Sequence, residues 1–127
     1  MSSALSAPRA VVAARLRQIR QLRGLSQRDV GIRMGLDKDT ASARISRYES
    51  EAMTVSLESL FALAQALDVP PAYLLADTPA MADAILALGT ESATQQTRLA
   101  EAVAALVAMP VGQRKALLEG LLDTHRP

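Results

Sequence analysis

The chain contains no cysteine and no tryptophan, with two tyrosines, one phenylalanine and a single histidine. Without cysteine it has no disulfide and no thiolate metal site, which is typical of a reducing cytosol. Half of the residues are hydrophobic but only 2% are aromatic, so a core must be built from Leu, Ala, Val and Ile. This composition favours helices over strands, and we predict an all-α fold.

The chain also lacks features that catalysis or a membrane requires. Its one histidine, His125, lies near the C-terminus, and there is no glycine-rich phosphate loop and no carboxylate cluster with metal-ligand spacing. We therefore expect no enzymatic activity, no metal and no cofactor. The apolar runs are shorter than the roughly 18 to 20 residues of a membrane span, and residues 1–14 make a poor signal peptide. We expect a cytoplasmic protein with no membrane partner.

The net charge of +1 conceals two halves of opposite sign. Residues 1–50 hold ten Arg or Lys and four acids, a net charge of +6, whereas residues 51–127 hold four bases and nine acids, a net charge of −5. This division indicates that a polyanion binds the first half only. The alternative is that the arginines merely solvate helix faces.

The ends of the first two helices are marked by characteristic residues. Pro8 suits the first turn of a helix, where its missing N–H has no partner to lose, and Gly24 suits the left-handed position that ends one. Ser26 and Asp29 have the spacing of a capping box, which begins a second helix. Gly35 ends that helix after barely two turns, so a tight glycine turn leads into the next one.

A third helix follows, and its two faces differ. Asp37 is placed to cap its N-terminus, and Ala41, Ile45 and Tyr48 fall at spacings of four and three, which predicts a buried stripe. Small polar residues and arginines occupy the remaining faces, a composition that lets a helix approach the base edges of DNA. We interpret residues 25–49 as a helix-turn-helix.

Leucine-rich segments make up the rest of the chain. Ser56 caps a predicted fourth helix that ends before Pro70, and residues 72–75 form a short fifth helix. The sequence Asp77-Thr78-Pro79 reads as a domain boundary. Beyond it we predict helices over residues 80–88, about 91–109 and 111–125.

Two segments carry a family resemblance, Arg-Gln-Leu-Arg-Gly-Leu-Ser-Gln at 20–27 and Ile-Ser-Arg-Tyr-Glu at 45–49. With residues 12–75 as a whole, they resemble the lambda-repressor-like Xre/Cro family of transcription regulators. The resemblance implies a five-helix DNA-binding domain over residues 9–76. The small polar residues before it predict a flexible arm (1–8), and the Ala- and Leu-rich segments after it predict a helical extension (79–127).

The resemblance also implies functional positions. We expect five residues to face the bases of DNA, with a phosphate contact as the alternative for the last of them: Thr40, Ser42, Ala43, Ser46 and Arg47. We expect five others to bind phosphates: Gln27, Arg28, Lys38, Arg44 and Ser50. Arg20 and Glu49 match a structural ion pair beneath the recognition helix. Relatives often have Asn and then Gly where this chain has Ser50 and Glu51, which weakens the expected contact at Ser50.

One stretch departs from the family's usual pattern. Fourteen steps separate Gly35 from Glu49, about four more than usual, and four residues are close to one helical turn of about 3.6. Our preferred interpretation is that the recognition helix gains one turn at its N-terminus, which would bring Lys38, Asp39 and Thr40 to the DNA. The alternative is a longer turn before an unchanged helix.

The last two predicted helices carry apolar stripes that we assign to dimerisation: Leu99, Val103, Leu106, Leu117, Leu118, Leu121 and Leu122. Folding back onto the first domain is the alternative. The predicted function is a nucleoid-associated, sequence-specific regulator of double-stranded DNA, acting as a homodimeric repressor on a palindromic operator. A second hypothesis is a protein-interaction module, such as an antitoxin or accessory factor, that binds a partner protein through the C-terminal helices.

Overall fold

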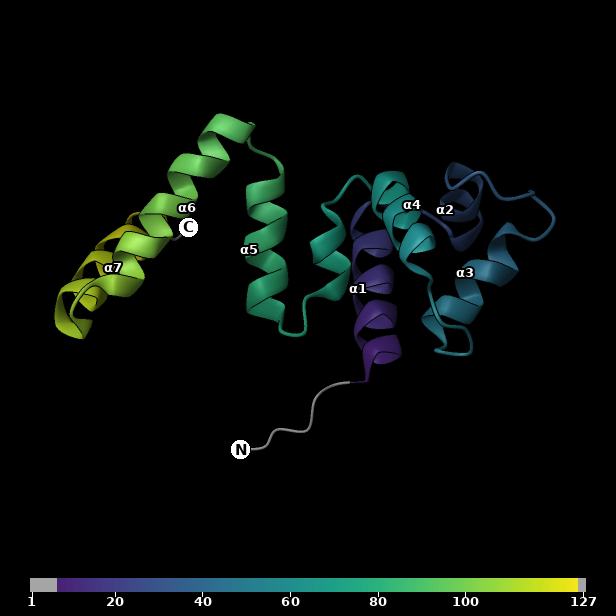
Figure 1. The fold of residues 1–127 in the computed structure, drawn as a ribbon, viewed down its shortest axis with the longest axis horizontal. Helices are drawn as coiled ribbons and strands as arrows, with labels where there is room; N and C mark the ends of the chain where they lie inside the picture. The colour runs from purple at the N-terminus through teal and green to yellow at the C-terminus, as the bar shows by residue number, and fades with distance from the viewer. Residues whose placement is uncertain (1–6, 126–127) are drawn as a thin grey trace. The chain divides into compact units, whose positions relative to one another are not determined.

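The computed structural model describes residues 7–125, and all regular structure in that range is helical, which confirms the predicted all-α class (Figure 1). The elements are α1 (Pro8–Leu22), α2 (Gln27–Arg33), α3 (Ala41–Glu49), α4 (Leu57–Leu67), η1 (Pro71–Leu75), α5 (Pro79–Gly89), α6 (Ala93–Ala108) and α7 (Val111–His125). The short fifth helix of the prediction, η1, is a 3₁₀-helix that begins at Pro71. Residues 1–6, the greater part of the predicted arm, lie outside the described residues.

The helix ends follow the predicted chemistry. Gly24 and Gly35 adopt φ angles of +69° and +92°, in the left-handed region that glycine occupies without strain. Asp29 donates its amide N–H to Ser26 Oγ, and Asp29 Oδ2 accepts the amide N–H of Ser26, each at 2.9 Å, so the capping box of α2 is complete. The bond from the Ser26 amide is the main reason why the pKa of Asp29 lies below its ordinary value.

The chain divides into an N-terminal unit that ends at Gly89 and a C-terminal unit that begins at Thr90. The N-terminal unit has an aliphatic core with two buried tyrosines, drawn from every one of its elements; its largest fully buried side chains are Leu16, Ile19, Val30, Ile45, Leu63, Leu67, Tyr73 and Leu74. Ala41, Ile45 and Tyr48, which were predicted to form the buried stripe of α3, are all buried. In α4 the first residue, Leu57, is exposed.

Helix α5 belongs to the core of the N-terminal unit. Ala82 is fully buried, and Ile85 and Leu86 pack beside it. A Cβ atom at Gly89 would lie 2.7 Å from the ring of Pro70, so the end of α5 touches the loop after α4. The packed unit therefore continues past the boundary predicted at residues 77–79 and ends after Gly89.

Several arginines of the N-terminal unit join segments far apart in the sequence. The buried Arg15 donates through Nε to the carbonyl oxygen of Ala76 at 2.8 Å. Arg23 and Arg33 donate to carbonyl oxygens of residues 66–68 at the end of α4, at 2.9–3.4 Å. Cations at a helix C-terminus stabilise it, because the last carbonyls are unpaired and the helix dipole is negative there. These arginines hold the fold together.

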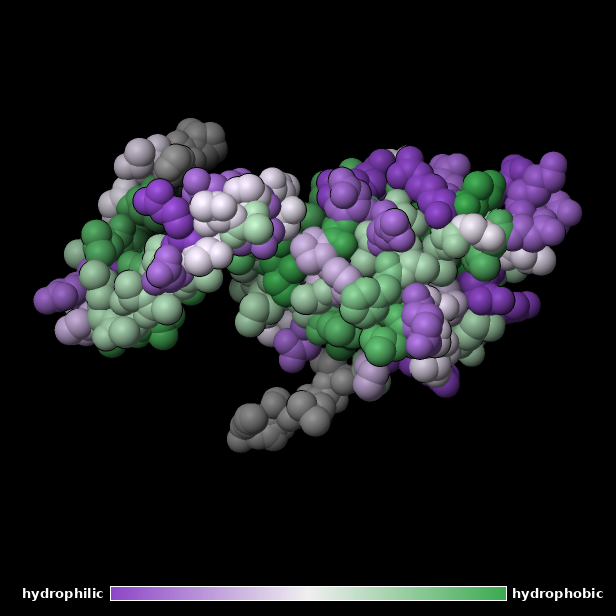
Figure 2. Space-filling view, turned by 45° about the horizontal axis from the view of Figure 1, so that its top comes forward, coloured by the Kyte–Doolittle hydropathy of each residue, from purple (hydrophilic) through white to green (hydrophobic). Residues whose placement is uncertain are grey.

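The C-terminal unit consists of α6 and α7, joined by a short turn. Arg114 Nη1 donates to the carbonyl oxygen of Val107 at 3.3 Å, which links the start of α7 to the end of α6. Within residues 90–124 no side chain is buried. The surface of this unit carries many hydrophobic residues (Figure 2).

Candidate nucleic-acid interface

The segment between α2 and α3 is a structured turn. Asp37 Oδ1 accepts the amide N–H of Asp39 at 2.9 Å, and the carbonyl oxygen of Asp37 accepts the amide N–H of Thr40 at 3.0 Å. Helical bonding begins only with the bond from Arg44 N to Thr40 O. The predicted longer recognition helix is therefore wrong: the four extra residues lengthen the turn, and α3 begins at Ala41.

The predicted cap by Asp37 is also wrong. Its carboxylate satisfies an amide inside the turn, while Thr40 occupies the N-cap position of α3 and makes no side-chain capping bond. Thr40 Oγ1 instead donates to the carbonyl oxygen of Asp37 at 3.3 Å. Thr40 and Lys38, which we expected at the DNA, are both exposed and sit on this turn.

Helix α3 lies against α2 and presents its other face to solvent. At Gly31 of α2 a Cβ atom would come within 2.5 Å of the Ala41 Cβ atom, so the two helices approach each other closely. Ala41, Ile45 and Tyr48 fill the inner face. The outer face brings together four of the expected base-reading residues, all exposed: Ser42, Ala43, Ser46 and Arg47.

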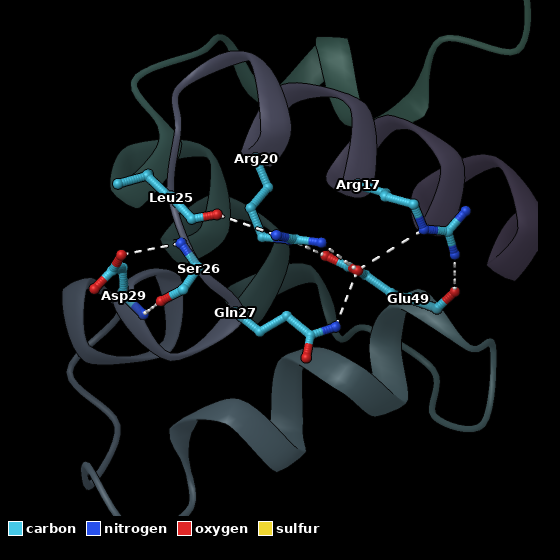
Figure 3. Close-up of polar contacts among 7 residues, drawn as sticks. All are labelled: Arg17, Arg20, Leu25, Ser26, Gln27, Asp29 and Glu49. Atoms are coloured by element: carbon cyan, nitrogen blue, oxygen red, sulfur yellow. Dashed lines mark hydrogen bonds and ion pairs between the residues drawn. The ribbon is translucent and has the colours of Figure 1, made fainter.

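The last residue of α3, Glu49, is fixed by side chains from α1 and α2 (Figure 3). Its carboxylate accepts two hydrogen bonds from Arg20, at 2.6 and 3.0 Å, and one from Gln27 Nε2 at 3.1 Å. Arg17 Nη2 donates to the Glu49 carbonyl oxygen at 2.7 Å. Glu49 is 5% exposed, and its bonds to Arg20 raise the pKa of that guanidinium. The bidentate pair locks α3 onto α1.

The resemblance pointed to Arg20 and Glu49 but not to the rest of this network. Gln27, which we expected to bind phosphate, is half-buried and donates to Glu49. Arg17 lies one helical turn before Arg20, and that spacing is the sequence signal that could have placed it here. Arg20 Nη1 also donates to the Leu25 carbonyl oxygen at 3.1 Å. The network therefore connects α1, α2 and α3 directly below the exposed face.

The remaining expected phosphate ligands differ in their exposure and in their side-chain contacts within the fold. Arg28, Lys38 and Arg47 are exposed, and none of them makes a side-chain hydrogen bond or ion pair with the described part of the chain. Arg44 is half-buried, with Nη1 3.5 Å from Tyr48 Oη. Ser50 Oγ donates to the Arg47 carbonyl oxygen at 3.3 Å.

The loop after α3 shows the effect of the missing glycine. Glu51 adopts a φ angle of +67°, in the left-handed region where a Cβ atom causes strain. Arg9 of α1 braces this loop, donating to Thr54 Oγ1 at 2.8 Å and to the Glu51 carbonyl oxygen at 3.3 Å. The loop keeps the backbone that glycine would favour and is held by an arginine.

The described residues contain no cluster of three or more His, Asp or Glu side chains that could hold a metal ion. None of the described helices is long and apolar enough to cross a membrane. The polar surface of α3, resting on α2 and flanked by free cations, is the arrangement of a helix-turn-helix DNA-binding domain.

The comparisons with known proteins agree with this class. Residues 16–74 match the helix-turn-helix family. The crystal structure of the transcriptional regulator BswR is similar with a TM-score of 0.68 and 31% sequence identity, over 76% of this chain and 95% of that chain. No curated protein matches the sequence. The chain belongs to the lambda-repressor-like (Xre) helix-turn-helix family and is a DNA-binding transcriptional regulator.

Proposed function

We propose that this regulator is a sequence-specific repressor, which binds a palindromic operator in double-stranded DNA as a homodimer in the cytoplasm, on the nucleoid. One observation carries the proposal: the exposed face of α3 combines Ser42, Ala43, Ser46 and Arg47, while α2 and the preceding turn supply free cations beside it. The small side chains let α3 enter the major groove, and Arg47 can bind guanine O6 and N7 through two hydrogen bonds.

The cations divide into two groups with different tasks. Arg15, Arg20, Arg23 and Arg33 are occupied within the fold, so the first half of the chain offers DNA fewer positive charges than its composition suggests. Arg28 of α2 and Lys38 of the turn before α3 remain to bind phosphates, together with Arg44 of α3 and Ser50 at its C-terminal end. Gln27 lies at the start of α2, where the helix dipole favours a phosphate, and its hydrogen bond to Glu49 fixes the position of its side chain there.

Repression needs no chemistry in this scheme. The protein occupies its operator and excludes polymerase, and the exposed apolar faces of α6 and α7 join two copies. Two recognition helices related by a twofold axis then reach half-sites about 34 Å apart, one turn of DNA.

The test is binding of the full chain to DNA fragments selected from a random pool, with salt varied. We expect a palindromic consensus and a steep fall of affinity with salt, because each neutralised phosphate adds a slope of about −0.9 to the plot of log K against log salt. Weak binding without sequence preference would refute a sequence-specific repressor.

Arg47→Ala tests base reading directly. We expect a loss of about 1–3 kcal/mol in binding free energy, concentrated at one base pair of each half-site. Lys38→Ala should weaken binding on all sequences and reduce the salt slope by about one. Arg98→Ala in α6 removes the same charge as Arg47→Ala away from the predicted interface and should leave binding unchanged. An equal effect of Arg47→Ala on all sequences would limit Arg47 to a phosphate contact.

A further inference from the structure

The C-terminal unit forms two regular helices of 16 and 15 residues without a core. Seven of its large hydrophobic residues are 40–69% exposed: Leu99, Val103, Val107, Val111, Leu117, Leu121 and Leu122. Helices of this length are marginal in water and depend on packing against another surface. The unit therefore requires a partner that covers this apolar surface.

We propose that the partner is a second copy of this chain, and that the two α7 helices pack antiparallel at the centre of a four-helix bundle formed by two α6–α7 hairpins. The arrangement rests on the proposed homodimer and specifies its interface. Two hairpins placed face to face bury their apolar stripes against each other, as in other four-helix bundles. A twofold axis makes such an interface self-complementary.

The charges beside the apolar stripe of α7 fix the direction of pairing. Lys115 and Glu119 are one helical turn apart; Lys115 lies three residues before Leu118, and Glu119 lies three residues before Leu122. Antiparallel helices that cross near residue 117 place Lys115 opposite the partner's Glu119, and by symmetry this pair occurs twice. A parallel arrangement would place like charges opposite each other and is disfavoured.

Both residues are available for this contact. Lys115 and Glu119 are exposed, and neither makes a side-chain hydrogen bond or ion pair within the described residues. Lys before Glu at this spacing is also the weaker order for an ion pair within one helix, since the reverse order suits the helix dipole. Arg114, by contrast, is already bound to the Val107 carbonyl oxygen and holds each hairpin together.

A charge exchange in the full chain tests the arrangement. The dimer dissociation constant is measured by analytical ultracentrifugation for the wild type, for Lys115→Glu, for Glu119→Lys and for the two changes combined. We expect each single change to weaken the dimer roughly tenfold, because two attractive contacts become repulsive, and the combined variant to return close to the wild type. Glu101→Lys on α6 makes the same change of charge as Glu119→Lys on the side away from the α6 stripe, and should have no effect.

Each other result has a definite meaning. Unchanged dimers in both single variants would indicate either parallel α7 helices, in which like charges face each other in every variant, or an α7 that does not pair in this register; either reading overturns the arrangement but leaves a homodimeric repressor intact. A wild-type chain that is monomeric at all concentrations would overturn the arrangement and the homodimer together. DNA selection with the wild type reports separately on sequence-specific binding, so failure of the interface and failure of the DNA-binding function are distinguishable.

Discussion

The two units of this molecule are built from similar residues but bury them differently. The N-terminal unit encloses Leu, Ile, Val and Tyr side chains in one core, whereas residues 90–124 bury none although their helices are rich in Ala and Leu. The buried polar contacts also belong to the N-terminal unit, where buried Glu49 has three side-chain partners from two helices; residues 90–124 have no buried polar side chain. The difference shows that helical periodicity identifies a face to be buried without identifying its partner.

The largest loss of stability is expected when a buried charge is removed from the N-terminal unit. Glu49→Ala strands Arg20, whose side chain is only 15% exposed, and should lower the free energy of unfolding by about 2–4 kcal/mol. The measurement is urea unfolding followed by tyrosine fluorescence. Both tyrosines, Tyr48 and Tyr73, are buried in the N-terminal unit, so the signal reports on that unit alone.

The matched control for this change is Glu101→Ala on α6, which removes an exposed carboxylate. It should shift the same transition by less than about 0.5 kcal/mol. Similar losses in both variants would mean that the network around Glu49 does not hold α3 in place.

The second prediction concerns the contact between α2 and α3. Gly31→Ala places a Cβ atom 2.5 Å from the Ala41 Cβ and 2.8 Å from its Cα and carbonyl oxygen. Because backbone atoms cannot swing aside, we expect a loss of about 1–3 kcal/mol in the tyrosine-detected transition. DNA affinity should fall as well, since α3 must shift on its support. Unchanged stability would show that α2 and α3 separate without cost.

The sequence predicted those features that depend on neighbouring residues. The capping box of Ser26 and Asp29, the left-handed glycines and the inner stripe of α3 need only short spacings to be recognised. Asp37 shows the limit of this reasoning, because a carboxylate that accepts an amide two residues later serves a helix cap and a turn equally well. The sequence could therefore not decide whether the extra residues join the helix.

Local spacing predicted no long-range contact, and the one long-range pair that was predicted, Arg20 with Glu49, came from the family resemblance. Arg15 meets Ala76 across 61 residues, and Arg23 meets Leu67 across 44, with no local pattern to indicate either partner. For the same reason the sequence did not show that the N-terminal unit extends to Gly89, beyond the boundary predicted at residues 77–79. Helices α5 and α6 are both rich in Ala and Leu, yet of the two only α5 has a residue, Ala82, in the core. At the interface, the family resemblance predicted the base-facing positions of α3 and the Arg20–Glu49 pair, whereas the contacts of Arg17 and Gln27 with Glu49 were found only in the structure.

A third prediction tests the start of α2 through its pH dependence. The pKa of Asp29 is lowered by the bond from the Ser26 amide, so the folded state favours the carboxylate. Its stabilisation is complete above the ordinary pKa of 3.8 and is lost as pH falls through the lower pKa of the folded state. Asp29→Asn should therefore be less stable near neutral pH and should lose less stability on acidification below about pH 4. If the free energy of unfolding of the variant and of the wild type falls equally on acidification, the acid sensitivity belongs to groups other than Asp29.

The smallest effect is expected in the C-terminal unit. Gly120 lies inside α7 with nothing within 4 Å of the position of an added Cβ, so the substitution that is harmful at Gly31 meets open space here. Gly120→Ala should stabilise α7 by about 0.5–1 kcal/mol through helix propensity. Slower hydrogen exchange of α7 amides would report this gain, while the tyrosine-detected transition of the N-terminal unit stays unchanged. A weaker dimer in this variant would place Gly120 in the interface, on the side of α7 opposite the Leu118 and Leu122 stripe, and would require a different crossing of the two α7 helices.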